Sequence, residues 1–291
     1  MTGILLVDKE QGWTSSDVVA RLRGVLHERR IGHAGTLDPL ATGLLVVMVG
    51  RAAKASDYLM RHPKQYRAYL RPGMVTDTQD ISGRILARQQ PVFSEQELKA
   101  VVAHFLGNQM QIPPMYSAIK IGGKKLYDIA RRGGEVERAP RHITIDEITL
   151  EGREGEDYIL NIRCSSGTYI RTLCHDIGQV LGCGACMTQL RRLSSGSYRV
   201  EDAHTIAEIA SSAAAGTVDE LLKPVDSVFS EMEAITVEAS DAARIRCGGM
   251  IPMEGEPDRR LRVYAPTGEF LMVGRIEAGL LKTEKNFFEV S

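Results

Sequence analysis

Residues 32–43 read "GHAGTLDPLATG" and combine three Gly with one His, one Pro and one acidic residue, Asp38. They are followed directly by "LLVVMVG" (residues 44–50), an apolar run with the length and β-branched content of a buried strand. The loop therefore leads into the hydrophobic core. An acidic side chain next to the core requires a physical reason, and four interpretations of Asp38 are open from this stretch alone.

The first interpretation is a helix N-cap, since Asp before Pro often starts a helix; the Gly and β-branched residues that follow would keep such a helix short. The second is a phosphate-binding loop, but the stretch lacks G-x-x-x-x-G-K-[ST], and a carboxylate repels phosphate. The third is metal ligation together with His33, although two ligands are few for a metal. The fourth is a catalytic carboxylate held by Gly and Pro at the end of a sheet.

Strand and helix patterns alternate irregularly around this loop. Residues 4–8 predict a strand, and Val18, Val19 and Leu22 have helical spacing after an N-cap expected at Ser15 or Ser16. Further helices are expected near residues 52–60, 94–107, 125–132 and 204–214, and further strands between them. The pattern indicates an α+β protein, with a small β-rich segment of short strands and Gly turns from about residue 233 onward.

The composition is that of an ordinary globular protein, with 291 residues of which 43% are hydrophobic and 25% charged. No apolar run reaches the roughly 18 residues of a membrane span, and the N-terminus lacks the pattern of a signal peptide. These features predict a cytoplasmic protein without a membrane partner.

Charge is distributed unevenly along the chain. Residues 1–200 hold 27 Lys and Arg against 20 Asp and Glu, whereas residues 201–291 hold 9 against 17. A basic body of net charge +7 favours a polyanionic partner such as nucleic acid, although chance segregation of surface charges gives the same numbers.

Residues 112–141 concentrate this positive charge and interleave it with two Tyr. Cations for phosphates and rings for bases are what contacts to RNA require, and a solvated loop is the alternative. Gly and Pro in the segment predict an excursion from the main sheet. The candidate contacts to an RNA backbone are Lys124, Lys125, Arg131 and Arg132.

The five Cys residues suit reduced thiols better than a disulfide framework, because their number is odd. Cys174 next to His175, and Cys183 with Cys186 as C-x-x-C, raise the question of a zinc site. The two pairs are closer together than in the usual zinc patterns, and the segment also fits an amphipathic helix ended by glycines. Packed thiols are the preferred interpretation, with no metal.

Five segments together resemble the bacterial tRNA pseudouridine-55 synthases of the TruB family. They are "LLVDKEQGWTSSDVV", "GHAGTLDPLATGLLVVMVGRAAK", "KQYRAYLRPGMVTDTQDISG", "QIPPMYSAIKIGGKKLYDIARRG" and "SSGTYIRTLCHDIGQVLGCGACMTQLRR". They occur in the order of the family and span about residues 3–200. The chain departs from the family at Cys186, where His is common, so no catalytic role is expected there.

The resemblance implies roles for individual residues. Asp38 matches the catalytic aspartate, Tyr66 the aromatic residue that stacks on the target base, and Tyr169 and Arg171 an active-site tyrosine and an arginine paired with the catalytic carboxylate. Two further matches are less direct. His33 matches a residue contacting the flipped bases of the T loop, and Leu190 an apolar wall of the uracil pocket.

The resemblance also implies the fold and the reaction. We expect a pseudouridine synthase domain over residues 1–232, with a mixed, largely antiparallel central sheet and an RNA-gripping insertion at about 112–141. A small PUA-like domain is expected over residues 233–291. The expected reaction is isomerisation of uridine-55 in tRNA by a monomer without a cofactor; a noncatalytic module that binds or folds tRNA is the alternative. A glycoside or nucleoside hydrolase is disfavoured because no second catalytic carboxylate is evident.

Overall fold

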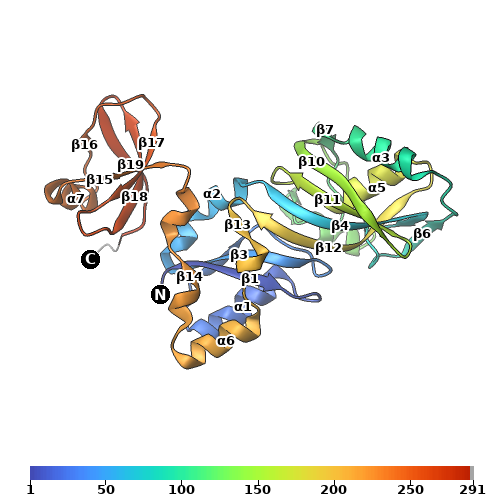
Figure 1. Cartoon of the computed structure of the whole chain (residues 1–291), viewed down its shortest axis with the longest axis horizontal. Helices are drawn as coiled ribbons and strands as arrows, with labels where there is room; N and C mark the ends of the chain where they lie inside the picture. The colour runs from blue at the N-terminus through green and yellow to red at the C-terminus, as the bar shows by residue number, and fades with distance from the viewer. Residues whose placement is uncertain (289–291) are drawn as a thin grey trace.

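Figure 1 shows the computed structural model of the chain, which describes residues 1–288 with the exception of the side chain of Lys125. The main body is a ten-stranded sheet of order β14-β1-β3-β12-β4-β11-β10-β7, with β2 beside β3 and β13 beside β12. Within the described residues, β3 and β12 form the one parallel pair of this sheet and the other pairs are antiparallel. The expected α+β class with a mixed, largely antiparallel sheet is confirmed.

The elements of the main body are as follows. The strands of the large sheet are β1 Gly3–Lys9, β2 Ile31–Ala34, β3 Thr42–Val49, β4 Lys64–Pro72, β7 Gly107–Gln111, β10 Arg141–Glu154, β11 Asp157–Cys164, β12 Ala185–Ser195, β13 Tyr198–Arg199 and β14 Leu222–Lys223. Two small hairpins are formed by β5 Met74–Thr76 with β6 Ile85–Arg88 and by β8 Lys120–Ile121 with β9 Lys124–Lys125. The helices are α1 Ser15–Leu26, α2 Ser56–Arg61, α3 Glu95–His104, α4 Leu126–Arg131, α5 Ile170–Val180 and α6 Ile206–Ala215, with 3-10 turns η1 Gly50–Ala55, η2 Val200–Asp202, η3 Val218–Leu221 and η4 Val225–Phe229.

Strand β3 is apolar throughout because both of its faces are covered. Successive side chains of a strand point to opposite faces of the sheet. Leu45 and Val47 join the core that α1, α3, α5 and α6 cover, whereas Leu44 and Val46 join a second core on the other face, against η1 and η4. A strand buried on both faces has a continuous apolar sequence rather than an alternating one.

The N-cap of helix α1 lies one residue before the first position expected for it. Thr14 is the N-cap: its hydroxyl accepts a hydrogen bond from the Asp17 amide at 3.0 Å, and the Asp17 carboxylate accepts one from the Thr14 amide at 2.9 Å. The expectation of Ser15 or Ser16 as the cap is therefore wrong. The physical reason is that the Ser15 hydroxyl bonds the backbone of Leu37, in the loop that carries Asp38.

The C-terminal part is β-rich, as expected. Its sheet has the order β15-β17-β18-β19-β16, and it packs around its own buried cluster together with α7. The bounds are β15 Glu233–Thr236, α7 Ala239–Arg246, β16 Ile251–Pro252, β17 Arg260–Tyr264, β18 Phe270–Glu277 and β19 Leu280–Asn286. Figure 1 shows it to the left of the main body, which it meets through aromatic contacts: Phe229 lies 4.9 Å from the Tyr58 ring and 5.6 Å from the Phe287 ring.

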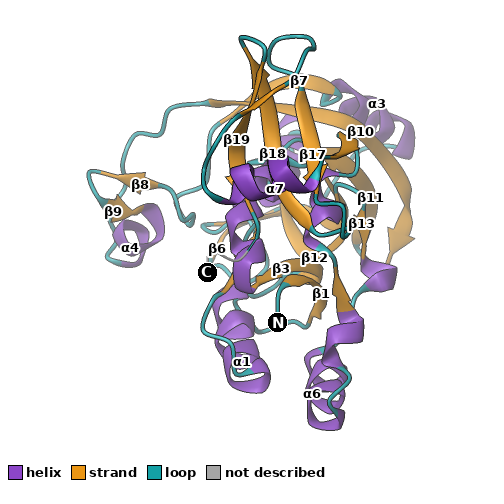
Figure 2. Cartoon of the chain, turned by 90° about the vertical axis from the view of Figure 1, so that its left-hand side faces the viewer, coloured by secondary structure: helices purple, strands orange, loops and turns teal. Residues whose placement is uncertain are grey.

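The basic segment 112–141 leaves the sheet after β7 and returns to it at β10. Gln111, the residue before it, and Arg141, its last residue, lie opposite each other in the β7–β10 pair. Between them the chain forms the β8–β9 hairpin and α4, which extend from the body on long connections (Figure 2). The neck of this excursion is thus closed by a pair of main-sheet residues.

Candidate active site

One cavity of about 790 Å³ opens where the Asp38 loop, β4, β12 and the start of α5 meet. The residues of the expected site that line it are Asp38, Tyr66, Tyr169, Arg171 and Leu190. Tyr116, Tyr127 and Arg141 also line it, so the basic segment forms part of its wall. The fold therefore brings together five side chains that are distributed over more than 150 residues of sequence.

The other expected residues do not line this cavity. His33 lies on β2, where its Nδ1 is buried without a hydrogen-bond partner in the described part of the chain. Lys124, Arg131 and Arg132 are exposed on the β8–β9–α4 excursion, and the side chain of Lys125 lies outside the described residues. The guanidinium of Arg131 stacks over the Tyr127 ring at 5.4 Å, so this basic surface continues into the cavity wall.

The Asp38 loop is fastened to α1 and the segment before it. The Ser15 hydroxyl accepts a hydrogen bond from the Leu37 amide at 2.9 Å, and the Pro39 carbonyl accepts one from the Gly12 amide at 2.8 Å. The Asp38 carbonyl accepts a bond from Ala41, which closes a turn rather than a helix. The helix N-cap interpretation of Asp38 is therefore wrong.

A glycine ends the loop because β3 approaches β12 closely there. Gly43 has a φ of +93°, and a Cβ atom on it would lie 2.4 Å from the Arg192 carbonyl oxygen. Glycine is the residue that fits both conditions without strain. This close approach forms the parallel contact between β3 and β12, and it fixes the position of the loop relative to Leu190 and Arg192.

Asp38 is paired with a buried guanidinium. Arg171 Nη2 lies 2.9 Å from Asp38 Oδ2, and Arg171 is 7% exposed whereas the Asp38 side chain is 37% exposed. Burial by the surrounding protein raises the pKa of Asp38 above its ordinary value of 3.8, while the Arg171 charge opposes this rise. The carboxylate is thus held toward the cavity by a cation that has little contact with solvent.

A second carboxylate, Asp80, was not singled out from the sequence. Its Oδ2 lies 3.7 Å from Arg171 Nη1, and its side chain is 5% exposed. Its Oδ1 accepts hydrogen bonds from the Thr78 hydroxyl at 2.8 Å and the Ser82 amide at 3.0 Å. Nothing in "TDTQD" distinguishes Asp80 from Asp77, so the local sequence does not predict that Asp80 belongs to the site.

Arg192 and Lys64 form a buried basic wall of the cavity. Arg192 is 1% exposed and donates to the carbonyls of Leu44 at 2.6 Å and Gly35 at 3.0 Å. Lys64 Nζ donates to the carbonyls of Met60 and His62, and burial lowers its pKa to about 8. Arg191 has a different role, since it pairs with Asp8 on the other face of β12.

Two tyrosines border the cavity from opposite elements. Tyr66 on β4 is 9% exposed, and burial raises the pKa of its phenol, so the hydroxyl is neutral. Tyr169 is the N-cap residue of α5, in an extended conformation, and its ring lies 6.0 Å from the Arg171 guanidinium. A flat ring and a carboxylate on one cavity wall are suited to a planar heterocycle attached to a sugar.

The cysteines of the expected thiol cluster pack in the core. Cys174 lies on α5 and Cys186 on β12, both fully buried, and burial raises the pKa of Cys186 to about 11. The expected amphipathic helix is α5, which ends at Val180 just before Gly182 and Gly184, and β12 begins at Ala185. Within residues 1–288 there is no group of three or more His, Cys, Asp or Glu arranged to hold a metal ion.

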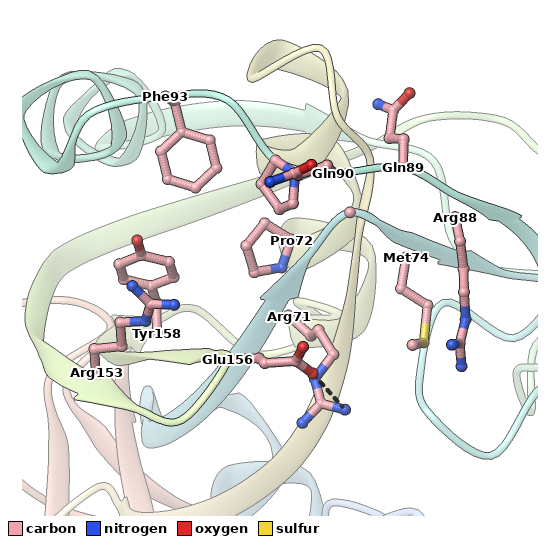
Figure 3. A pocket seen from close by; sticks show the side chains of 12 residues that line it. Arg71, Pro72, Met74, Arg88, Gln89, Gln90, Phe93, Arg153, Glu156 and Tyr158 are labelled. Atoms are coloured by element: carbon pink, nitrogen blue, oxygen red, sulfur yellow. Dashed lines mark ion pairs between the residues drawn. The ribbon is translucent and has the colours of Figure 1, made fainter.

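A second recess, of about 670 Å³, lies at the far end of β4 (Figure 3). Arg71 projects into it and pairs with Asp157 at 2.6 Å and with Glu156 at 3.7 Å. The Tyr158 ring lies beneath the Arg153 guanidinium at 5.3 Å. Three arginines, Arg71, Arg88 and Arg153, line this recess together with the exposed carboxylate of Glu156, so the two recesses differ in chemistry.

The fold is shared with chains of solved complexes. One chain of the crystal structure of a Cbf5-Nop10-Gar1 complex superposes with a TM-score of 0.77 at 23% identity, over 99% of this chain and 85% of that one. A chain of an H/ACA RNP bound to a substrate RNA containing 2′-deoxyuridine gives a TM-score of 0.75 at 21% identity, over 99% of this chain and 86% of that chain. The chain therefore shares its fold with chains of these two solved complexes.

Family comparisons are more specific. The TruB family pseudouridylate synthase N-terminal domain matches residues 23–170, and the tRNA pseudouridylate synthase B C-terminal domain matches residues 171–230. The tRNA pseudouridine synthase B of Escherichia coli O139:H28 is 40% identical over 95% of this chain and 92% of its own length; that of Alkaliphilus oremlandii is 44% identical over 86% and 83%. The chain belongs to the TruB family of pseudouridylate synthases.

No helix within residues 1–288 is long and apolar enough to cross a membrane.

Proposed function

We propose that the protein converts uridine-55 in the T loop of tRNA to pseudouridine. The observation that carries the proposal is the Asp38–Arg171 pair, which places a carboxylate in a cavity between Tyr66 and Tyr169. Membership of the family supports the coarser statement that the chain is a pseudouridine synthase acting on tRNA. The position of the target uridine and the residue roles are part of the proposal.

The reaction breaks the N1–C1′ bond, turns the uracil, joins C5 to C1′, removes the proton from C5 and adds one proton to N1. Atoms and electrons balance without an oxidant, so no cofactor is required. In the proposed mechanism the ionised Asp38 attacks the sugar or base, or stabilises positive charge at C1′, as carboxylates do in glycosidases. Arg171 supports this role because its charge opposes the effect of burial on the pKa of Asp38.

The target base must leave its stack to reach Asp38. We propose that the Tyr66 ring replaces the lost stacking, that Leu190 forms the apolar side of the uracil pocket, and that Tyr169 assists removal of the C5 proton. His33 does not line the cavity, so any contact it makes is with neighbouring bases rather than with the target. The buried charges of Arg192 and Lys64 are placed to attract the phosphates of the flipped nucleotide.

The surrounding surface fits a tRNA arm. We propose that Lys124, Lys125, Arg131 and Arg132 contact the RNA backbone, since those of their side chains that the structure describes are exposed beside the cavity wall. We further propose that residues 1–232 form the catalytic domain and residues 233–291 a PUA-like domain. The protein acts in this proposal as a cytoplasmic monomer on the T arm.

One experiment tests the assignment. Unmodified tRNA is incubated with the protein, and pseudouridine is mapped by position, with a tRNA carrying cytidine at position 55 as the control. Pseudouridine at position 55 supports the proposal, and pseudouridine elsewhere overturns the proposed target. Unchanged tRNA would indicate a binding or folding module, and free uracil would indicate a hydrolase.

A further inference from the structure

Gln111 is a buried polar residue that has no role in the proposed mechanism. It is the last residue of β7, at the outer edge of the main sheet, and its side chain is 4% exposed. A buried amide with unsatisfied groups is costly, so both of its polar atoms require partners. Both partners belong to the backbone of Tyr169, 58 residues further along the chain.

The two hydrogen bonds form a reciprocal pair. Gln111 Nε2 donates to the Tyr169 carbonyl at 3.0 Å, and Gln111 Oε1 accepts from the Tyr169 amide at 2.8 Å. Tyr169 has φ −97° and ψ 105°, the extended conformation of a strand residue. The Gln111 amide thus acts as a one-residue strand partner for Tyr169.

The pair fixes the point at which the active-site wall turns into α5. Tyr169 is the N-cap of α5, and its own side chain makes no capping hydrogen bond. Its amide is held by Gln111, and its carbonyl accepts from both Gln111 and Leu173, which forms the first helical bond at 3.0 Å. Arg171, the partner of Asp38, follows two residues later. The same two hydrogen bonds therefore also position the backbone from which the Arg171 side chain extends.

Gln111 is also the last residue before the basic excursion, and it lies opposite Arg141, where the excursion ends. The neck of the RNA-facing segment is therefore bonded directly to the backbone of an active-site tyrosine. A residue with this placement connects the surface that meets the RNA with the cavity in which the base reacts.

We infer that Gln111 is a positioning residue, whose amide holds Tyr169 and, through it, Arg171 in register with Asp38. The inference rests on the proposed roles of Asp38 and Tyr169. It requires a donor and an acceptor at the end of the side chain, not merely a side chain of this volume. Removing the amide affects reaction of bound RNA more than affinity for RNA, because Gln111 has no exposed surface with which to contact RNA.

The decisive variant is Gln111→Glu. An ionised carboxylate accepts from the Tyr169 amide but cannot donate to its carbonyl, whereas a protonated carboxyl group restores both bonds. We expect the single-turnover rate at saturating tRNA to fall roughly 10- to 100-fold at neutral pH, as for other losses of positioning. The ratio of variant to wild-type rate then recovers as the pH is lowered.

Two controls separate positioning from stability. Gln109→Glu introduces the same charge on the same strand, where the side chain makes only bonds of 3.4 and 3.5 Å, so its rate ratio stays independent of pH. Gln111→Met keeps the volume without polar atoms and has a lowered rate at every pH, with the dissociation constant for tRNA within about threefold of wild type.

The outcomes are distinct. A pH-independent rate ratio for folded Gln111→Glu, or a loss of affinity equal to the loss of rate, overturns the inference. Wild-type protein that forms no pseudouridine at position 55 overturns the proposed function instead. Melting of each variant, followed by circular dichroism at each pH, identifies any loss of activity that is due to unfolding alone.

Discussion

The two recesses of the main sheet contain the same kind of ion pair with opposite members buried. In the cavity, Arg171 is 7% exposed and Asp38 37%. In the recess of Figure 3, Asp157 is 7% exposed and Arg71 28%. The first arrangement presents a carboxylate to whatever enters, and the second presents a cation.

The hydrogen bonds explain why only one of these carboxylates is chemically available. Asp157 accepts from Arg71 through both oxygens, at 2.6 and 3.1 Å, and from the Thr188 hydroxyl at 2.8 Å. Asp38 meets Arg171 through Oδ2, and within the described part of the chain its Oδ1 accepts no hydrogen bond. A nucleophile needs free lone pairs, so the burial of the arginine rather than of the aspartate suits the role proposed for Asp38.

The same substitution in both pairs gives the largest expected contrast. Asp38→Asn should lower the single-turnover rate by about three orders of magnitude or more, with little change in tRNA affinity, because charge is lost and shape retained. Asp157→Asn should leave the rate within about threefold of wild type but lower the free energy of unfolding by about 1–3 kcal/mol. Near-normal turnover by Asp38→Asn would break the comparison and falsify the catalytic role.

Arginine-to-lysine changes test whether geometry or charge is needed. Arg171→Lys should lower the rate by about 100-fold, because a point charge cannot span Asp38 and Asp80 as the planar guanidinium does. Arg71→Lys, on the exposed side of its pair, should retain near-normal turnover. Single-turnover rates of the two variants check this, and equal losses would count against the difference between the recesses.

The tyrosines give a third contrast. Tyr66→Ala should lower turnover by about 5- to 150-fold, the range expected for one lost base stack, while Tyr66→Phe keeps the ring and most of the activity. Tyr158→Ala should leave turnover unchanged, because that ring stacks with Arg153 of the protein itself. Equal activity of the two Tyr66 variants would contradict a stacking role.

Affinity for tRNA at several salt concentrations compares the basic surfaces. Replacing Lys124, Lys125, Arg131 and Arg132 with Ala should weaken binding and reduce the log–log salt slope by up to about 3.6, since each phosphate contact contributes about 0.9. Turnover at saturating tRNA should change less than affinity. Arg88→Ala with Arg153→Ala at the second recess should leave the slope unchanged, and parallel lines for all proteins would exclude an RNA contact by the 112–141 segment.

The smallest effect concerns pH and is absent near neutrality. In the proposed mechanism Asp38 must be ionised to act, and burial raises its pKa above the ordinary 3.8. The rate should therefore fall as the pH drops through this raised pKa. Arg171 is the strongest opposing influence on this pKa, so Arg171→Gln should move the acidic limb of its residual activity to higher pH. A pH profile of the single-turnover rate measures both, and an unshifted limb would show that Arg171 does not act on the charge of Asp38.

Much of the fold followed from the sequence because the signals are local. The apolar run of residues 44–50, the helical spacing of Val18 and Leu22, and the Ser94 cap with Glu97 each fix an element within a few residues. Asp38, Tyr66, Tyr169 and Arg171 were found through the motif resemblance. The glycines expected to end the helix before Cys183 also acted locally, since α5 ends at Val180 and Gly182 and Gly184 follow with positive φ.

The sequence by itself determined which residues are proposed to carry the chemistry, since motif and residue type are properties of the chain. Only the tertiary structure decided which partner of each ion pair is buried, because burial depends on how β4, β12 and α5 meet. It also decided that Asp80 faces Arg171 and that Gln111 holds Tyr169 across 58 residues. Long-range hydrogen bonds leave no periodic trace in sequence; they follow from strand register, which is set by the packing of the whole sheet.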